Sequence, residues 1–300
     1  MNFVREQVAV RAPATSANLG PGFDSLGLAL ALYDDVRARL TPGGISVTVT
    51  GEGDGELTSD SSHLVASSAL AAFDRLGCRP PGLEIVCHNR IPQARGLGSS
   101  SAAIVAGIML ARLLVRDGVR LMDGAAALRL ASEIEGHPDN VAPCLLGGFT
   151  IAWDGVNGAR AVRLEPSPGV QPMIFMPTER GLTAHARAAL PANVPHADAA
   201  ANAGRAALLV HALTAEPALL LDATEDRLHQ AYRAPGMPAT AALVARLRAA
   251  GLAAVVSGAG PSVLALVDAA AAPAVPDTPG WRILSPGCDT EGAKGALDFL

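Results

Sequence analysis

A stretch rich in glycine and serine, residues 95–103 (RGLGSSSAA), carries the residue types best suited to binding an anion. Gly96 and Gly98 allow backbone dihedral angles that other residues avoid, and they let a ligand approach the main chain. The three serines stand where the apolar, helix-favouring stretch 104–114 begins. The unpaired amides of a first helical turn and the positive end of the helix dipole together favour a phosphate group. The stretch therefore predicts a phosphate-binding loop, although a turn that only caps a buried helix fits it about equally well.

Two common phosphate-binding patterns are absent from this stretch. The pair of Lys and Ser/Thr that closes G-x-x-x-x-G-K-[ST] is missing, and G-x-G-x-x-G does not occur in it. The choice between a ligand-binding loop and a structural turn therefore depends on the rest of the chain.

Two further loops are rich in glycine, proline and small residues. The first, residues 12–24, contains Asn18 and Asp24, whose side chains can hydrogen-bond a ligand, although Asn and Asp also form turns. Its prolines and glycines predict a long irregular loop after a strand over 4–11. The second, residues 257–262, separates two apolar strands and by itself is typical of a hairpin turn.

Two carboxylates stand near the end of a helix predicted over residues 122–134. Glu133 and Glu135 come just before the turn-like stretch 137–140 (HPDN). A negative charge near a helix C-terminus opposes the helix dipole, so local stability does not favour the pair. A bound metal ion or simple exposure to solvent would relieve this conflict.

Composition limits the classes of function. The chain has 300 residues, of which 50% are hydrophobic and only 3% aromatic, and its formal net charge is −5. This balance argues against a nucleic-acid partner, which usually requires a basic face or stacking aromatic residues. A small-molecule ligand is the better expectation.

The cysteine pattern and the apolar runs bear on the cellular compartment. The four cysteines show no C-x-x-C spacing and are expected to be buried and reduced. Arg5 and Glu6 precede any apolar run, and no apolar stretch approaches the roughly 20 residues of a membrane span. These features predict a cytoplasmic protein without a membrane partner.

The elements around the glycine-serine loop have the order that a phosphate site needs. A strand over 83–87 leads into the loop and a helix follows it, while a helix over 64–76 precedes that strand. Alternation over 25–49 predicts antiparallel strands, and the two prolines within 165–170 mark the expected boundary between two halves.

Three stretches, 13–27, 92–103 and 257–262, resemble in order the three motifs of the GHMP kinase family. The resemblance covers nearly the whole chain and implies an α+β, two-domain GHMP kinase fold. It implies an N-terminal domain like ribosomal protein S5 over residues 1–165, rejoined by 275–300. A ferredoxin-like C-terminal domain is implied over 166–274, with the active site between the two domains.

Within this family, residues 137–143, 183–187 and 226–235 resemble the branch that phosphorylates the side-chain hydroxyl of L-homoserine, a step toward threonine. The resemblance implies a phosphotransferase that uses ATP and Mg²⁺ and forms a homodimer. The alternative is a GHMP kinase that acts on another small alcohol.

The resemblance also implies roles for individual residues. Asp24 would receive the substrate ammonium, and Arg187 and Arg233 its carboxylate, where a guanidinium can make two bonds at once. Asn18 and Asn140 would act at the hydroxyl and count, with Glu133, as catalytic. The remaining residues expected around the acceptor are His137, Thr183 and Gly260.

The nucleotide and metal sites follow from the same resemblance. The residues expected to bind ATP are Pro92, Arg95, Gly96, Leu97, Gly98, Ser99, Ser100, Ser101, Ala102 and His63. Glu133 is the expected Mg²⁺ ligand, with Ser100 as a second ligand and Glu135 as the alternative to Glu133. His63 departs from the family, which usually has Asn there, and the single lysine, Lys294, is far from every motif.

Overall fold

The structure, a computed structural model, describes residues 3, 7–181, 183–270 and 274–295. Its strands are β1 (Gln7–Ala17), β2 (Leu26–Thr41), β3 (Gly44–Gly51), β4 (Gly82–Asn89), β5 (Phe149–Gly155), β6 (Gly158–Leu164), β7 (Val170–Met176), β8 (Ala253–Val256), β9 (Val263–Asp268), β10 (Arg282–Leu284) and β11 (Lys294–Gly295). Its α-helices are α1 (Leu64–Arg75), α2 (Ser99–Leu114), α3 (Gly118–Leu121), α4 (Gly124–Glu135), α5 (Pro138–Leu146), α6 (Thr183–Ala188), α7 (His196–Thr214), α8 (Leu220–Ala223), α9 (Gln230–Arg233) and α10 (Pro238–Ala249). Two short 3₁₀ turns, η1 (Pro217–Leu219) and η2 (Ala234–Gly236), complete the described elements.

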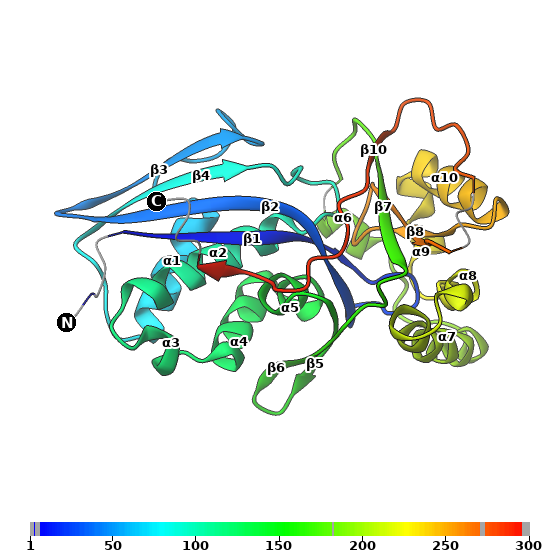
Figure 1. The fold of residues 1–300 in the computed structure, drawn as a ribbon, viewed down its shortest axis with the longest axis horizontal. Coiled ribbons are helices and arrows are strands. Elements are labelled where there is room, and N and C mark those ends of the chain that lie inside the picture. Colours follow the sequence, from blue (N-terminus) through cyan, green and yellow to red (C-terminus); the bar gives the residue numbers. More distant parts are fainter. Residues whose placement is uncertain (1–2, 4–6, 182, 271–273, 296–300) are drawn as a thin grey trace.

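Two sheets divide the molecule (Figure 1). In the described residues, the first sheet has seven strands in the order β11-β1-β2-β4-β3, with β5 paired to β2 and β6 paired to β5. The second sheet has four strands in the order β10-β7-β9-β8. Helices α1, α2, α4 and α5 lie on one side of the first sheet, and α7 to α10 lie around the second (Figure 1). The expected α+β architecture is confirmed.

Helix α2 is the centre of the first half. Its residues are apolar around most of its circumference, and eleven of them are buried in the described structure. A helix that is apolar on all sides must be enclosed by other elements, and α2 contacts β1, α1, α4 and α5. The N-terminus of α2 is thus held firmly where the glycine-serine loop enters it.

Three expectations about local structure were wrong. Strand β1 continues through Pro13 to Ala17, so residues 12–17 are not irregular; a break in register between Pro13 and Ala14 accommodates the missing amide of proline. Strand β3 pairs with β4 in parallel, although its neighbourhood suggested antiparallel pairing. The stretch 138–146 is helix α5 with proline in its first turn, where an N–H is not needed.

The C-terminal segment contributes to both sheets. Strand β10 pairs with β7 in the second sheet, and β11 pairs with β1 in the first.

The domain boundaries at 165 and 274 stay a prediction. In the described residues, no helix is long and apolar enough to cross a membrane.

Candidate active site

The loop between β4 and α2 is held in a special conformation. Gly96 and Gly98 have φ of 72° and 69°, in the left-handed region that glycine tolerates. A Cβ atom at Gly98 would lie 1.9 Å from Thr15 Oγ1, and one at Gly96 would lie 2.1 Å from the carbonyl oxygen of Ser257. Both glycines are therefore required, because the loop is seated directly on the other two glycine-rich segments.

The N-terminus of α2 offers its first amides to a ligand. Gly98 is the N-cap residue, and no side chain makes a capping bond at this end of the helix. The first intrahelical bond of this end runs from the amide of Ala102 to the carbonyl of Gly98. The amides before it have no partner within the helix, which suits an anion.

A cavity of about 570 Å³ opens in front of this helix end. Most of the residues expected to bind ATP line it, and so do those expected around the acceptor: Asn18, Asp24, His63, Arg95, Gly96, Leu97, Gly98, Ser99, Ser100, Ala102, His137, Asn140, Arg187, Arg233 and Gly260. The three glycine-rich segments and the expected acceptor-binding residues Arg187 and Arg233 thus share one site.

Several residues expected in the site are not among those that line the cavity in the described part of the chain. Pro92 is buried just before the loop and does not line the cavity. Ser101 is buried in the first turn of α2 and contacts the site only through the carboxylate of Glu135. Thr183 is the first residue of α6, and its side chain lies outside the described part of the structure.

Glu135, and not Glu133, is the carboxylate at the phosphate loop. The hydroxyls of Ser100 and Ser101 donate to Glu135 Oε1 at 2.7 and 3.0 Å, and Glu135 lines the cavity. Glu133 instead pairs with Arg75 at 2.6 Å on the surface. The expectation that Glu133 binds the metal does not fit this arrangement, because residues two apart on a helix point to different faces.

The donor set around Glu135 fits Mg²⁺ better than a metal held by protein alone. Mg²⁺ prefers oxygen ligands and is usually bound by one or two carboxylates together with substrate phosphates. Glu135 and Ser100 supply such oxygens beside the helix end. In the described residues, no group of three or more His, Cys, Asp and Glu side chains could hold a metal ion.

Asp24 and Arg187 form an ion pair in the part of the cavity where the acceptor is expected, here called the acceptor end. Their two hydrogen bonds are 2.7 and 3.0 Å long, and each side chain is about one-third exposed. The pair keeps both charges satisfied at a mouth that a charged ligand can enter. Asp24 has φ of 54° and Asn18 φ of 68°, which shows how tightly the loop between them is shaped.

Arg233 differs from Arg187 because it is buried and no carboxylate faces it within ion-pair distance in the described residues. Its Nε donates to the carbonyl of Ala186 at 3.1 Å, and NH1 donates to that of Gly258 at 3.3 Å. Burial lowers the pKa of Arg233 from its ordinary value. A buried cation without a counter-ion is costly, so the site calls for an anionic ligand.

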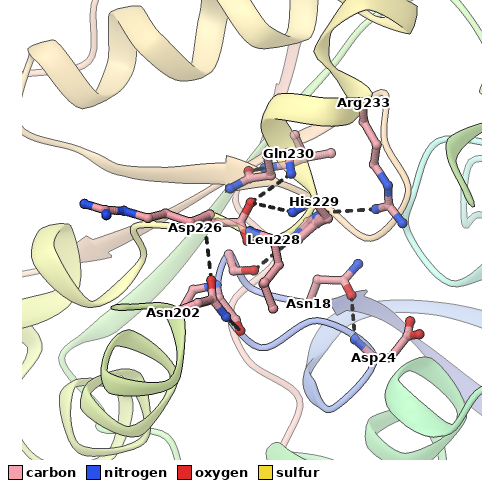
Figure 2. A network of polar contacts seen from close by, with 12 residues as sticks. Asn18, Asp24, Asn202, Asp226, Leu228, His229, Gln230 and Arg233 are labelled. Atoms are coloured by element: carbon pink, nitrogen blue, oxygen red, sulfur yellow. Dashed lines mark hydrogen bonds and ion pairs between the residues drawn. The ribbon is translucent and has the colours of Figure 1, made fainter. Parts of the chain in front are cut away.

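Asn18 and Asn140 are both fixed by neighbouring groups. Asn18 donates to the carbonyl of Gly258 at 2.9 Å and accepts from the amide of Asp24 at 3.0 Å (Figure 2). Asn140 lies in the first turn of α5, where its Oδ1 accepts a 2.8 Å bond from Thr15. The amide nitrogen of Asn140 is thereby left to face a ligand.

His137 is bound to a buried carboxylate. Its Nδ1 lies 2.5 Å from Asp139 Oδ1. Burial acts to lower the pKa of His137, but the hydrogen bond and negative charge of Asp139 outweigh it and raise the pKa above its ordinary value. The imidazole therefore carries positive charge more readily than a free histidine.

His63 is the N-cap residue of α1. Its Nδ1 accepts from the amide of Val65 at 3.3 Å, so Nε2 carries the proton. That Nε2 is buried in the cavity wall and has no partner in the described residues, while burial lowers the pKa of the ring. It is an unpaired donor in the lining of the cavity.

Two residues that hold parts of the site in place, Thr15 and Asp34, could not be identified from the sequence. Thr15 orients Asn140, but a threonine inside a strand gives no local signal. Asp34 lines the cavity and accepts from the amides of Arg90 and Ile91, at the entry to the loop. Only the pairing of distant strands brings these groups to the site.

Comparisons with known proteins agree with this architecture. The family model "GHMP kinases N terminal domain" matches residues 63–148, and "GHMP kinases C terminal" matches 199–277. Homoserine kinase of Streptomyces coelicolor is 59% identical over 288 residues, covering 95% of this chain and 93% of that protein. Homoserine kinase of Leifsonia xyli is 50% identical over 294 residues, covering 95% and 91%.

Solved structures add the three-dimensional comparison. The crystal structure of homoserine kinase from Cytophaga hutchinsonii is similar with a TM-score of 0.82 and 27% identity, covering 99% of each chain. Mevalonate diphosphate decarboxylase from Staphylococcus aureus shares the fold, with a TM-score of 0.68 and 15% identity over 97% of this chain and 98% of that one. The fold alone thus does not choose the substrate.

The matched family models, together with the phosphate loop at the N-terminus of α2, define a two-domain GHMP kinase, and the chain belongs to that family. Within it, the chain belongs with the homoserine kinases, to which it is about half to three-fifths identical over nearly its whole length.

Proposed function

We propose that this protein transfers the γ-phosphate of ATP to the side-chain hydroxyl of L-homoserine, giving O-phospho-L-homoserine for threonine biosynthesis. The observation that carries the proposal is Arg233, a buried guanidinium without a carboxylate partner in the described residues, in the same cavity as the phosphate loop. An amino-acid carboxylate supplies the missing charge. The identity to homoserine kinases supports the same substrate.

The charged end of homoserine matches the acceptor end of the cavity. The substrate ammonium and carboxylate carry opposite charges, as Asp24 and Arg187 do. When Asp24 contacts the ammonium and Arg187 contacts the carboxylate in place of each other, each of these charges keeps an opposite partner. Asn140, held by Thr15, lines the same cavity, and we assign it to the hydroxyl that attacks the γ-phosphate.

The phosphate end stabilises charge rather than performing covalent chemistry. Phosphoryl transfer passes through a loose transition state whose charge spreads over the equatorial oxygens, so it depends mainly on positioning and electrostatics. The amides at the start of α2 and its helix dipole serve this purpose. Glu135 and Ser100 are the residues we assign to Mg²⁺, which would neutralise the phosphate charge when bound.

The base of the nucleotide has a matching donor. His63 presents a buried N–H without a partner among the described residues, and nucleobases offer ring nitrogens and carbonyl oxygens as acceptors. We therefore assign His63 to the base of ATP.

The proposal also includes assembly and location: the protein would act as a homodimer in the cytoplasm. Sedimentation of the purified protein tests the assembly.

The function is tested by measuring ADP release from MgATP with L-homoserine, L-serine, L-threonine, mevalonate and galactose. Turnover confined to L-homoserine is the expected result. Turnover with mevalonate or galactose instead would mean a GHMP kinase for another alcohol, and would leave Asp24, Arg187 and Arg233 without their assigned ligand.

A further inference from the structure

A buried histidine, His229, contacts both the loop after β1 and Arg233. His229 lies just before α9, its side chain fully buried, between the loop after β1 and Arg233 (Figure 2). The carboxylate of Asp226 fixes this position by accepting from the amides of Leu228, His229 and Gln230 at 3.0, 3.2 and 2.8 Å. The backbone at His229 is therefore set before any ligand binds.

The hydrogen bonds of the ring determine its tautomer. His229 Nε2 lies 2.9 Å from the carbonyl oxygen of Gly20, and a carbonyl can only accept, so Nε2 carries a proton. Arg233 NH1 lies 3.2 Å from Nδ1 and can only donate, so Nδ1 must be unprotonated. Burial and the charge of Arg233 lower the pKa of His229 against the opposing carboxylates of Asp226 and Asp24, which agrees with a neutral ring.

This bond restricts which atoms of Arg233 remain for a ligand. Nε is bonded to Ala186, and NH1 is bonded to both His229 and Gly258. In the described part of the chain, NH2 has no hydrogen-bond partner. The ring of Phe23 lies 5.1 Å from the His229 ring and 5.2 Å from the guanidinium carbon of Arg233, closing the other side.

We propose that His229 is a positioning residue that turns the NH2 group of Arg233 toward the substrate carboxylate by accepting a hydrogen bond from NH1. The inference rests on the proposed function, because it assigns the carboxylate of L-homoserine to Arg233. His229 itself does not touch the substrate. It acts as a neutral acceptor, which an apolar or a cationic side chain cannot replace.

A purely structural role makes a different prediction from the same contacts. The bond from Nε2 to Gly20 also holds the loop that carries Asn18 and Asp24. Two substitutions separate these roles because they copy different ring atoms. His229→Asn places an amide oxygen near the position of Nδ1 and keeps the acceptor for Arg233. His229→Gln places an amide nitrogen near the position of Nε2 and keeps the donor to Gly20.

The test is steady-state kinetics of the full-length wild type and both variants with MgATP and L-homoserine. Loss of a hydrogen bond to a charged group predicts that His229→Gln raises the KM for L-homoserine by roughly tenfold or more. The KM for ATP stays unchanged, and kcat changes little. His229→Asn should retain most of the affinity for L-homoserine. Thermal unfolding should show that both variants lose some stability, because each removes part of the buried ring.

Two further measurements assign the effect to Arg233 and the carboxylate. In an Arg233→Ala background, adding His229→Gln should change the KM for L-homoserine no further. With 3-aminopropan-1-ol, which lacks the carboxylate, wild type and His229→Gln should show equal kcat/KM. Both results are expected only if the two residues act as one unit.

Three outcomes would overturn the inference. His229→Gln with wild-type KM for L-homoserine, His229→Asn impaired more than His229→Gln, or additive effects of the His229 and Arg233 substitutions would each leave His229 as a support for the loop. A wild type that does not phosphorylate L-homoserine would refute the proposed function instead. The wild-type assay thus separates the two failures.

Discussion

At the scale of single residues, the site depends on side chains whose charges are unbalanced until ligands arrive. Glu135 presents a carboxylate whose partners are the hydroxyls of Ser100 and Ser101. Arg233 is a buried cation that hydrogen-bonds only neutral groups in the described residues. A metal ion and a substrate carboxylate would restore the balance at the two ends of one cavity.

The metal assignment is tested by a matched pair of substitutions on α4. Glu135→Gln should lower kcat by roughly two orders of magnitude, because loss of a charge aligned with the transferring phosphate removes about 3 kcal/mol of stabilisation. Glu133→Gln breaks only the exposed pair with Arg75, which contributes at most about 1 kcal/mol to stability. MgATP-dependent turnover is the readout. Full activity of Glu135→Gln would refute the assignment.

Asp34 gives the protein a specific dependence on pH. Burial raises the pKa of Asp34 to about 6, although bonds from the amides of Ile91 and Arg90 work against this. Because the folded state holds this proton more tightly than the unfolded chain, the free energy of unfolding falls as pH rises through about 4 to 6, by roughly 3 kcal/mol.

Asp34→Asn tests this dependence. The amide oxygen of Asn can accept from the same two backbone groups, and it carries no charge to desolvate. Urea denaturation at pH 8 should show the variant to be more stable than wild type, with the difference vanishing near pH 4. A variant less stable than wild type at pH 8 would show that the ionised carboxylate is needed.

At the scale of elements, the phosphate loop is shaped by what lies beneath it. Gly98 combines a left-handed backbone with contact to Thr15 in β1. Gly77, which follows α1, has a similar φ of 72° but would have nothing within 4 Å of an added Cβ atom. Alanine substitutions at the two positions can therefore be compared. The substitution at Gly77 has only the energetic cost of a left-handed backbone, whereas the one at Gly98 adds the cost of a steric clash.

Gly77→Ala should lower the free energy of unfolding by about 1 kcal/mol, the cost of a left-handed alanine. Gly98→Ala should lower it by more than about 2 kcal/mol, since the contact with Thr15 adds to the same cost. It should also raise the KM for ATP. Chemical denaturation and kinetics measure both effects, and equal losses of stability at the two positions would contradict the close packing.

The same elements show what sequence can predict. The strand, loop and helix around Gly96 were predictable because periodicity, glycine and serine all indicate the same local order. The carboxylate that faces the loop was not predictable, because Glu133 and Glu135 stand two positions apart on one helix and only the packing of that helix against α2 decides which of them faces the loop. The parallel pairing of β3 with β4 likewise depends on a crossover through α1, which strand periodicity does not record.

At the scale of the whole molecule, the acceptor end is assembled from both halves of the chain. Asp24 comes from the segment after β1, whereas Arg187 and Arg233 belong to α6 and α9. The C-terminal segment pairs with both sheets through β10 and β11. Recognition of the acceptor therefore requires the relative position of the halves, whereas the phosphate loop belongs to one of them.

Arg187→Ala tests this division. It should raise the KM for L-homoserine by roughly tenfold or more while leaving the KM for ATP nearly unchanged, because the charged contact to the acceptor and the pair with Asp24 are lost and both lie at the acceptor end. Arg205→Ala is the control, since Arg205 pairs with Glu225 and does not line the cavity. An equal rise in both KM values for Arg187→Ala would show a general disturbance of the site.

The most direct test of the account is the identity of the product formed from MgATP and L-homoserine by the purified protein, followed by ³¹P NMR. We expect a phosphomonoester on the side-chain hydroxyl of homoserine, formed in equal amount to ADP and formed far more slowly by Glu135→Gln. ADP accompanied only by inorganic phosphate, or no ADP at all, would contradict it.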